Sequence, residues 1–116
     1  MAQMVKDSAY AAITAAGSSV TDATVLTGDV NVVTCSATTK GVTLPFSGPG
    51  MVITVKGDAT NNAHIYVANG GTIDGTAGAT GGTLTAAKTA MYVCTGLTAG
   101  TVGLASVWVT LAAALA

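Results

Sequence analysis

The sequence predicts an all-β domain: a small β-sandwich or jelly-roll-like barrel of about eight short strands, with an N-terminal arm or short helix. Three observations predict this class. Segments rich in Val, Ile and Thr alternate apolar and polar residues with the period of two that a half-buried strand requires. Turn residues separate these segments about every 8–12 residues. Glycine supplies 15 of the 116 residues, roughly twice the usual share of about 7%, without the G-X-Y period of collagen.

The length suffices for one domain with a single core. Residues 1–19 differ from the rest because they are rich in Ala. Apolar residues such as Val5 and Ile13 have a weak helical spacing that Gly17 could close, but an extended arm ordered against a neighbour fits equally well. We therefore expect an arm or short helix over residues 1–19 and a single β domain with an apolar C-terminal tail over residues 20–116.

The first half of this β domain contains three expected strands. They lie at residues 20–26, 30–35 and 42–44, with turns at residues 27–29 and 37–41. Pro45 ends the third strand. Phe46, the only Phe of the chain, is expected to anchor a corner at which residues 48–50 (GPG) reverse the chain.

Residues 51–55 and 63–68 are expected to pair as a β-hairpin. Ile53 and Val55 share one face of the first strand, and His64 and Ile65 lie on opposite faces of the second. The turn between them, residues 57–62 (GDATNN), carries residues that suit positive φ and local side-chain hydrogen bonds.

The second half alternates glycine-bounded segments with three further strands. A short apolar insert at residues 70–75 precedes a polar run at residues 76–82 (TAGATGG), which we expect to be a flexible, exposed tip. Strands follow at residues 83–85, 89–95 and 104–115, separated by a turn at residues 86–88 and a loop at residues 96–103. The last strand contains the only Trp, Trp108.

Charged residues are unusually scarce. They make up 8% of the chain, with neither Arg nor Glu among them, against roughly 25% in an ordinary soluble domain. A soluble monomer normally covers its surface with charge, whereas the centres of protein interfaces are depleted of it. We therefore expect a surface covered by Thr, Ser and Asn, and in part by other subunits.

The composition argues against nucleic acid and membranes as partners. The net charge is −1 and the four lysines are dispersed, so no basic cluster could displace counterions from phosphates. The most apolar stretch, residues 103–116, is shorter than the about 20 residues of a membrane-spanning helix. Lys6 and Asp7 interrupt the apolar core that a signal peptide would need. We expect the protein to be made and kept in a cytoplasm until it is assembled.

Cys35 and Cys94 lie in apolar, strand-like contexts. We expect both to be buried as small hydrophobic residues in a reducing compartment; a disulfide that closes a long loop is the alternative. Two cysteines with one distant histidine do not make a zinc site.

No combination of residues indicates catalysis. His64 is the only histidine, and no G-x-S-x-G motif accompanies it, so we expect a strand histidine that faces solvent or an interface. The aspartates do not form a calcium loop, and Asp58 and Asp74 have the setting of turn residues. The glycine-rich run at residues 78–82 lacks the lysine of a phosphate-binding loop. We expect no enzyme activity, no catalytic or metal-binding residue, no cofactor and no small-molecule substrate.

Five pieces of the sequence stand in a distinctive order. They are residues 42–45 (VTLP), 50–55 (GMVITV), 64–67 (HIYV), 71–75 (GTIDG) and 91–95 (MYVCT). In order and spacing they resemble a family of small bacteriophage virion proteins, which includes capsid decoration (cement) proteins and related head or tail fibre modules. That family has an apolar-x-L-P step, a G-x-x-(I/V)-T-V strand and a T-I-(D/N)-G insert before a Y-V-C strand and a closing Trp.

The resemblance covers residues 20–110, and two features depart from it. The family strand that ends at Val55 is usually followed by Asn-Asp, where this chain has Lys56 and Gly57. The closing Trp, here Trp108, usually ends the domain, whereas this chain continues to Ala116.

The resemblance implies a capsid decoration (cement) protein that binds the outer surface of a viral shell and stabilises it by non-covalent contacts. It implies a homotrimer with the major capsid protein as partner, located on the capsid surface of the virion after assembly in the host cytoplasm. The alternative is a receptor- or glycan-binding module of a phage head or tail fibre. Such a module would stack sugars on Tyr66, Tyr92 or Trp108, with residues 76–82 as a rim.

Apolar residues near the two chain ends are the candidates for contact with a partner or with another copy. An exposed C-terminal Ala-Ala-Ala-Leu-Ala would favour aggregation, so we expect another chain to cover it. The candidate interface residues are Met1, Met4, Val5, Tyr10, Ile13, Trp108, Leu111 and Leu115.

Overall fold

The computed structural model describes the backbone of residues 10–115 and the side chains of residues 10–111. Within this range the chain forms eleven strands and no helix, so it contains no helix that could cross a membrane. The strands are β1 (Tyr10–Thr14), β2 (Thr24–Val25), β3 (Val30–Thr34), β4 (Gly41–Leu44), β5 (Val52–Lys56), β6 (Ala63–Val67), β7 (Thr72–Ile73), β8 (Thr76–Ala77), β9 (Gly82–Leu84), β10 (Thr89–Ala99) and β11 (Leu104–Leu115).

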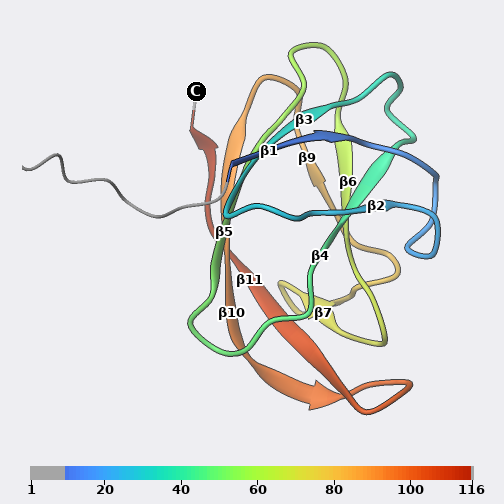
Figure 1. Ribbon diagram of the computed structural model, residues 1–116, viewed down its shortest axis with the longest axis vertical. Helices are drawn as coiled ribbons and strands as arrows, with labels where there is room; N and C mark the ends of the chain where they lie inside the picture. The colour runs from blue at the N-terminus through green and yellow to red at the C-terminus, as the bar shows by residue number, and fades with distance from the viewer. Residues whose placement is uncertain (1–9, 116) are drawn as a thin grey trace, which may run out of the picture.

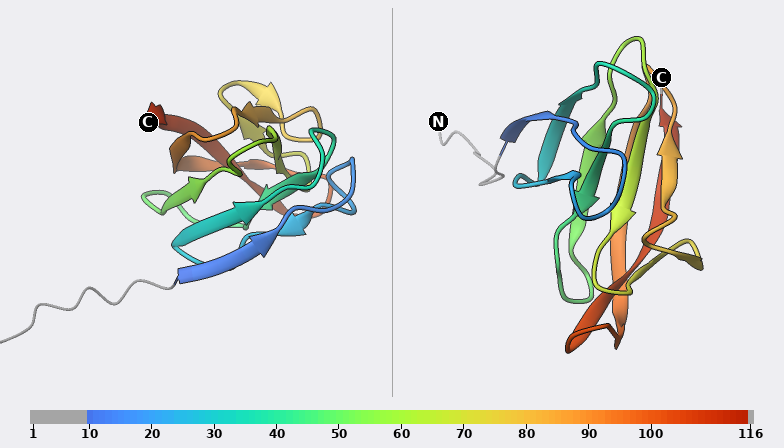
Figure 2. Two further views of the ribbon diagram at one scale, coloured as in Figure 1. Left: turned by 90° about the horizontal axis from the view of Figure 1, so that it is seen from above. Right: turned by 90° about the vertical axis from the view of Figure 1, so that its right-hand side faces the viewer.

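The strands form two sheets that pack face to face (Figures 1 and 2). The larger has seven strands in the order β1-β3-β5-β10-β11-β7-β8, and the smaller has four in the order β2-β4-β6-β9. Apolar side chains of both sheets meet between the layers, because inward and outward residues alternate along each strand. The predicted all-β, sandwich-like class is confirmed.

The first six strands alternate between the two sheets. β1, β3 and β5 are parallel neighbours in the larger sheet, and β2, β4 and β6 are parallel neighbours in the smaller one. The chain thus winds through three coils, each giving one strand to each layer, as in a β-solenoid. The long antiparallel pair β10–β11 then joins the larger sheet beside β5 and projects beyond the smaller sheet at one end of the molecule (Figures 1 and 2).

The expected hairpin of residues 51–55 and 63–68 is wrong. β5 lies in the larger sheet and β6 in the smaller, so the turn between them crosses from one layer to the other. Asp58 organises this crossing. Its carboxylate accepts hydrogen bonds from the backbone N–H groups of Thr60 (2.9 Å) and Asn61 (3.0 Å) in the turn, and from that of Cys35 (3.1 Å) in the preceding coil.

The N-terminal helix is not formed over the described residues. Tyr10–Thr14 is strand β1, parallel to β3 at the edge of the larger sheet, and Ile13 and Ala15 are buried in the core. Parallel pairing with β3 supplies the backbone hydrogen bonds that a helix would otherwise have supplied. Residues 1–9 lie outside the described part of the chain.

Two other segments differ from expectation. Residues 20–22 are a turn, because the Asp22 carboxylate accepts hydrogen bonds from the backbone N–H groups of Ser18 and Ser19 and from the Ser19 hydroxyl. The first half of the predicted loop at residues 96–103 is strand, since β10 continues to Ala99 and pairs with β11.

The glycine-rich run at residues 76–82 is not a free tip. Gly78 is buried; its N–H donates to the Gly71 carbonyl at 2.7 Å, and its own carbonyl accepts from the Val67 N–H at 3.1 Å. A Cβ atom at Gly78 would stand 2.1 Å from the Val67 carbonyl oxygen. Glycine at this position therefore permits close packing against the end of β6.

Trp108 lies at the centre of the core and is fully buried. Cys35 and Cys94 are also buried there, as expected, and both are free thiols, so the alternative disulfide is not formed. The Cys35 thiol donates to the Ala37 carbonyl at 2.9 Å, and the Cys94 thiol to the Ser47 carbonyl at 3.2 Å.

Candidate functional site

The predicted interface residues divide into three groups. Tyr10 and Leu111 are exposed, at 68% and 58% of their surface, and stay available for contact. Ile13 and Trp108 are buried in the core of the same chain, so neither can contact a partner. Met1, Met4 and Val5, and the side chain of Leu115, lie outside the described part of the structure.

The predicted sugar-stacking platforms are wrong. Tyr66, Tyr92 and Trp108 are exposed over no more than 5% of their surface. The Tyr66 hydroxyl donates to the Ser18 carbonyl at 3.1 Å, and His64 stacks on the Tyr66 ring with centroids 5.7 Å apart. A buried ring has no free face on which a sugar could lie.

Two apolar surfaces of the described structure are open. The first is the outer face of the larger sheet, which we call the bare face. Strand register places its outward side chains in rows across β1, β3, β5, β10 and β11. The apolar ones include Tyr10, Ala12, Val30 and Val109, which are exposed, and Val32, Val52, Met91, Val93 and Val107, which are half-buried. Thr14, Thr34, Thr54, Thr89 and Lys56 also lie in these rows, so Lys56 is the only charged side chain on this face among the described residues.

The outer face of the smaller sheet is covered in contrast. Thr43 and Tyr66 are register neighbours on this face, and both are buried. The loop that contains Ser18 contacts the Tyr66 hydroxyl, and Gly81 lies against the Tyr66 ring. Among the described residues, the chain therefore covers one outer face with its own loops and leaves the other uncovered.

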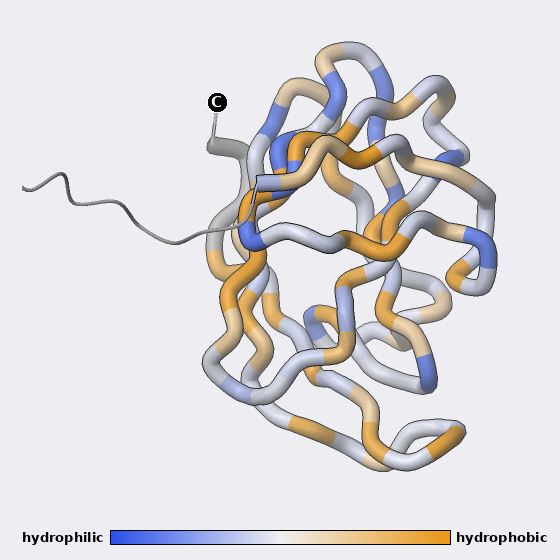
Figure 3. Tube along the Cα trace, viewed as in Figure 1, coloured by the Kyte–Doolittle hydropathy of each residue, from blue (hydrophilic) through white to orange (hydrophobic). Residues whose placement is uncertain are grey.

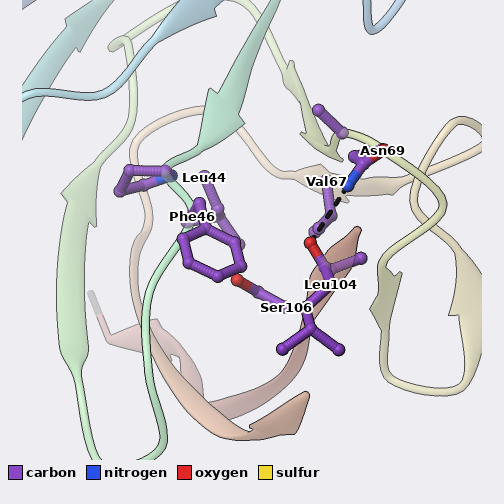
Figure 4. A pocket seen from close by; sticks show the side chains of 9 residues that line it. Leu44, Phe46, Val67, Asn69, Leu104 and Ser106 are labelled. Carbon is purple, nitrogen blue, oxygen red and sulfur yellow. Dashed lines mark hydrogen bonds between the residues drawn. The ribbon is translucent and has the colours of Figure 1, made fainter. Parts of the chain in front are cut away.

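The second open apolar surface is a hollow of about 250 Å³, which we call the Phe46 hollow. It lies at the end of the molecule from which β10–β11 projects. Figure 4 shows Leu44 and Phe46 on one side, Val67, Asn69 and Leu104 on the other, and Ser106 between them. Phe46 is exposed over 66% of its surface, so it stands at the rim instead of anchoring the corner as predicted. Most of the strongly hydrophilic residues lie away from this end of the molecule (Figure 3).

Hydrogen bonds fix the walls of the Phe46 hollow. Asn69, with a positive φ of 61°, donates to the carbonyls of Val102 (2.8 Å) and Leu104 (3.0 Å) and accepts from the Val102 N–H (2.8 Å). The Ser106 hydroxyl donates to the Ser47 carbonyl at 3.0 Å and accepts from the Ser47 N–H at 2.9 Å. Because the polar groups are satisfied within the chain, the hollow is preformed and offers mainly apolar contact.

A more polar hollow, of about 300 Å³, lies between Asp74, Lys88, Tyr92 and Thr110. Both carboxylate oxygens of Asp74 accept hydrogen bonds from Thr110, one from its N–H (2.7 Å) and one from its hydroxyl (2.5 Å). Burial, and secondarily the charge of Asp74, raise the pKa of the Tyr92 phenol well above its usual value. The phenol is therefore held protonated, and the carboxylate is committed to tying β7 to β11.

Other candidate chemistry is likewise structural in the described residues. Hydrogen bonds from the backbone N–H groups of Thr60, Cys35 and Asn61 lower the pKa of the Asp58 carboxyl, in keeping with its predicted turn role. No hydrogen bond joins His64 to another described side chain, and no cluster of three or more His, Cys or Asp residues within the described range could hold a metal ion.

The sequence did not identify the Phe46 hollow or the bare face. Phe46 stands out in the sequence as the only Phe, beside Pro45, but the hollow next to it is formed by residues 44–46, 67–69 and 104–106, which lie far apart in sequence. The sequence shows the valines of the bare face as alternate residues of each strand segment. Their alignment into one surface depends on the pairing of strands that are not neighbours in sequence.

The chain was also compared with known proteins. No family model, no curated protein and no solved structure matches it. The function is therefore argued from the two open surfaces and from the sequence resemblance described above.

Proposed function

We propose that this chain is a capsid decoration protein. It acts as a homotrimer that binds the outer surface of a viral shell, contacts the major capsid protein and stabilises the shell without covalent chemistry. The observation that supports a binding role is the preformed, uncharged Phe46 hollow with an exposed aromatic ring at its rim. The resemblance of residues 42–95 to small phage virion proteins supports a shell as the partner.

The Phe46 hollow has the features of an energetic centre of an interface. Such centres are enriched in aromatic side chains, lie next to pockets and exclude water when bound. Burial of one Phe side chain stabilises a complex by about 1.5–3 kcal/mol. In a homotrimer three such contacts would act together, so that weak single sites give firm attachment.

The residues on which the glycan-binding alternative depended are not available to a sugar. Its three aromatic platforms are buried, and no charged side chain lines the Phe46 hollow. A sugar site needs well-placed polar groups to fix orientation, whereas Asn69 and Ser106 already use theirs within the chain.

The test uses particles assembled from the genome that encodes this chain, with its gene deleted. Purified protein is added back, and binding is measured by co-sedimentation together with the temperature at which the particles rupture. The wild type should bind saturably and raise that temperature. Phe46→Asp should weaken binding by at least about tenfold, since loss of a central aromatic contact costs about 2 kcal/mol or more.

Thr38→Asp is the matched control, because Thr38 is exposed in the turn at the opposite end of β4. It adds the same charge and should bind as the wild type does. If the wild type binds no particle, the proposed function is wrong; if Phe46→Asp binds as tightly as Thr38→Asp, the hollow is not the contact.

A further inference from the structure

We propose that the bare face is the surface through which copies of this chain associate with one another. The inference rests on the proposed function for the existence of an oligomer, but it identifies the interface from the structure. It also separates that interface from the Phe46 hollow, which is left for the shell.

The bare face is a continuous apolar surface. Val30 pairs with Thr54, which pairs in turn with Met91. In the adjacent row, Val52 pairs with Val93 and Val93 with Val109. Register therefore makes side chains of β3, β5, β10 and β11 neighbours on one face, and most of them are β-branched.

The charge on this face does not oppose self-association. Lys56 is its only charged side chain, at the last residue of β5. The other outward side chains of this face, among the described residues, are apolar or threonine. Bare faces of different copies can therefore meet with few like charges between them.

The composition fits a second copy better than a shell protein. Interfaces between identical chains are more apolar than interfaces between proteins that also exist apart. An apolar face of this extent on a separate chain would promote aggregation, and copies of the same chain are present from synthesis onward. The smaller sheet needs no such cover, because the chain's own loops bury Tyr66 and Thr43.

The test is the molar mass of the full chain by sedimentation equilibrium over a wide range of concentrations. The wild type should have a multiple of the 11.2 kDa chain mass. Val93→Lys, at the centre of the bare face, should weaken association by at least about tenfold, because a buried, unpaired ammonium group is strongly unfavourable. Val32→Lys, on a different strand of the same face, should do the same.

Thr38→Lys adds the same charge away from the face and should keep the wild-type mass. Each variant is first checked for the blue-shifted emission of Trp108, which is buried only in the folded chain. A monomeric wild type, or folded Val93→Lys and Val32→Lys variants with the wild-type mass, would overturn the inference. A monomer that still binds gene-deleted particles overturns this interface and the trimeric state but leaves the attachment to a shell standing. A multimer that binds no particle overturns the attachment to a shell and leaves this interface standing.

Discussion

At the scale of single residues, Trp108 shows how its position in the sequence misled the functional prediction. It stands next to an apolar C-terminal stretch and was expected to face a partner, yet register places it opposite Cys94 and beside Ile73 inside the core. Its indole Nε1 is buried without a hydrogen-bond partner. A buried unpaired donor costs about 1–3 kcal/mol, so packing of the ring must outweigh that cost.

Replacement of Trp108 should separate these two effects. Trp108→Ala is expected to lower the free energy of unfolding by about 3–5 kcal/mol, because it leaves a large cavity. Trp108→Phe removes less volume and also removes the unpaired N–H, so it should cost no more than about half as much. Urea unfolding followed by circular dichroism measures both. Equal losses of unfolding free energy in the two variants would indicate that Nε1 has a hydrogen-bond partner, such as a buried water molecule.

Asp58 gives the stability a dependence on pH. Its folded-state pKa is lowered from 3.8 by the N–H donors of Thr60, Cys35 and Asn61. A carboxyl whose folded pKa lies below its unfolded value adds stability above the unfolded pKa, and that stability is lost as pH falls through the folded pKa. Stability should therefore decline below about pH 4.

Asp58→Asn should reduce this decline and lower stability at neutral pH. Urea midpoints measured from pH 7 down to pH 2.5 for both proteins test this expectation. Part of the decline should persist in the variant, because a side-chain hydrogen bond from Ser19 also lowers the pKa of Asp22. Indistinguishable pH profiles for the two proteins would show that Asp58 does not hold the crossing between the sheets.

At the scale of elements, alternation predicted where strands occur but not which strands pair. The cores of β3, β4, β5, β6 and β10 all fall within predicted segments. Residues 51–55 and 63–68 were nevertheless expected to pair with each other, because a polar turn joins them. An alternating strand has the same pattern whether its partner follows it directly or belongs to the next coil. The hydrogen bond from the Cys35 N–H to the Asp58 carboxylate, which ties the crossing between the sheets to the preceding coil, joins residues far apart in sequence.

The glycine-rich run illustrates the same limit, since its composition indicated a loop but not its packing. Gly78→Ala should lower the free energy of unfolding by about 1–3 kcal/mol, because the added Cβ would overlap the Val67 carbonyl oxygen and force β8 away from β6. Gly48→Ala is the control: a Cβ there meets no atom within 4 Å and the residue has no positive φ, so its effect should be near zero. A Gly78→Ala variant as stable as the control would show that the run is a free loop after all.

At the scale of the whole molecule, the composition predicted contact with other proteins, and this stays a prediction. Scarce charge indicated surfaces for other proteins, and the structure contains two open apolar surfaces, the bare face and the Phe46 hollow. Of the predicted contact residues, Tyr10 is exposed on the bare face, whereas Ile13 and Trp108 are internal. The sequence could not distinguish them because an inward and an outward apolar residue of one strand look alike without the register.

The proposal assigns one role to each surface: the bare face joins copies of this chain, and the Phe46 hollow contacts the shell. The bare face lies across the middle of the larger sheet, and the Phe46 hollow lies at the end where β4, β6 and β11 meet. Since the two surfaces share no residue, a trimer joined through the bare face could keep three hollows open toward a shell. Such an arrangement would gain attachment from avidity and requires no catalytic group.

The most direct test of the central claim is the number of copies of this chain in particles assembled from the genome that encodes it, measured by quantitative mass spectrometry of purified particles. A decoration protein should be present in many copies, at a fixed ratio to the major capsid protein. Its absence from purified particles, despite expression in the same cells, would contradict the account.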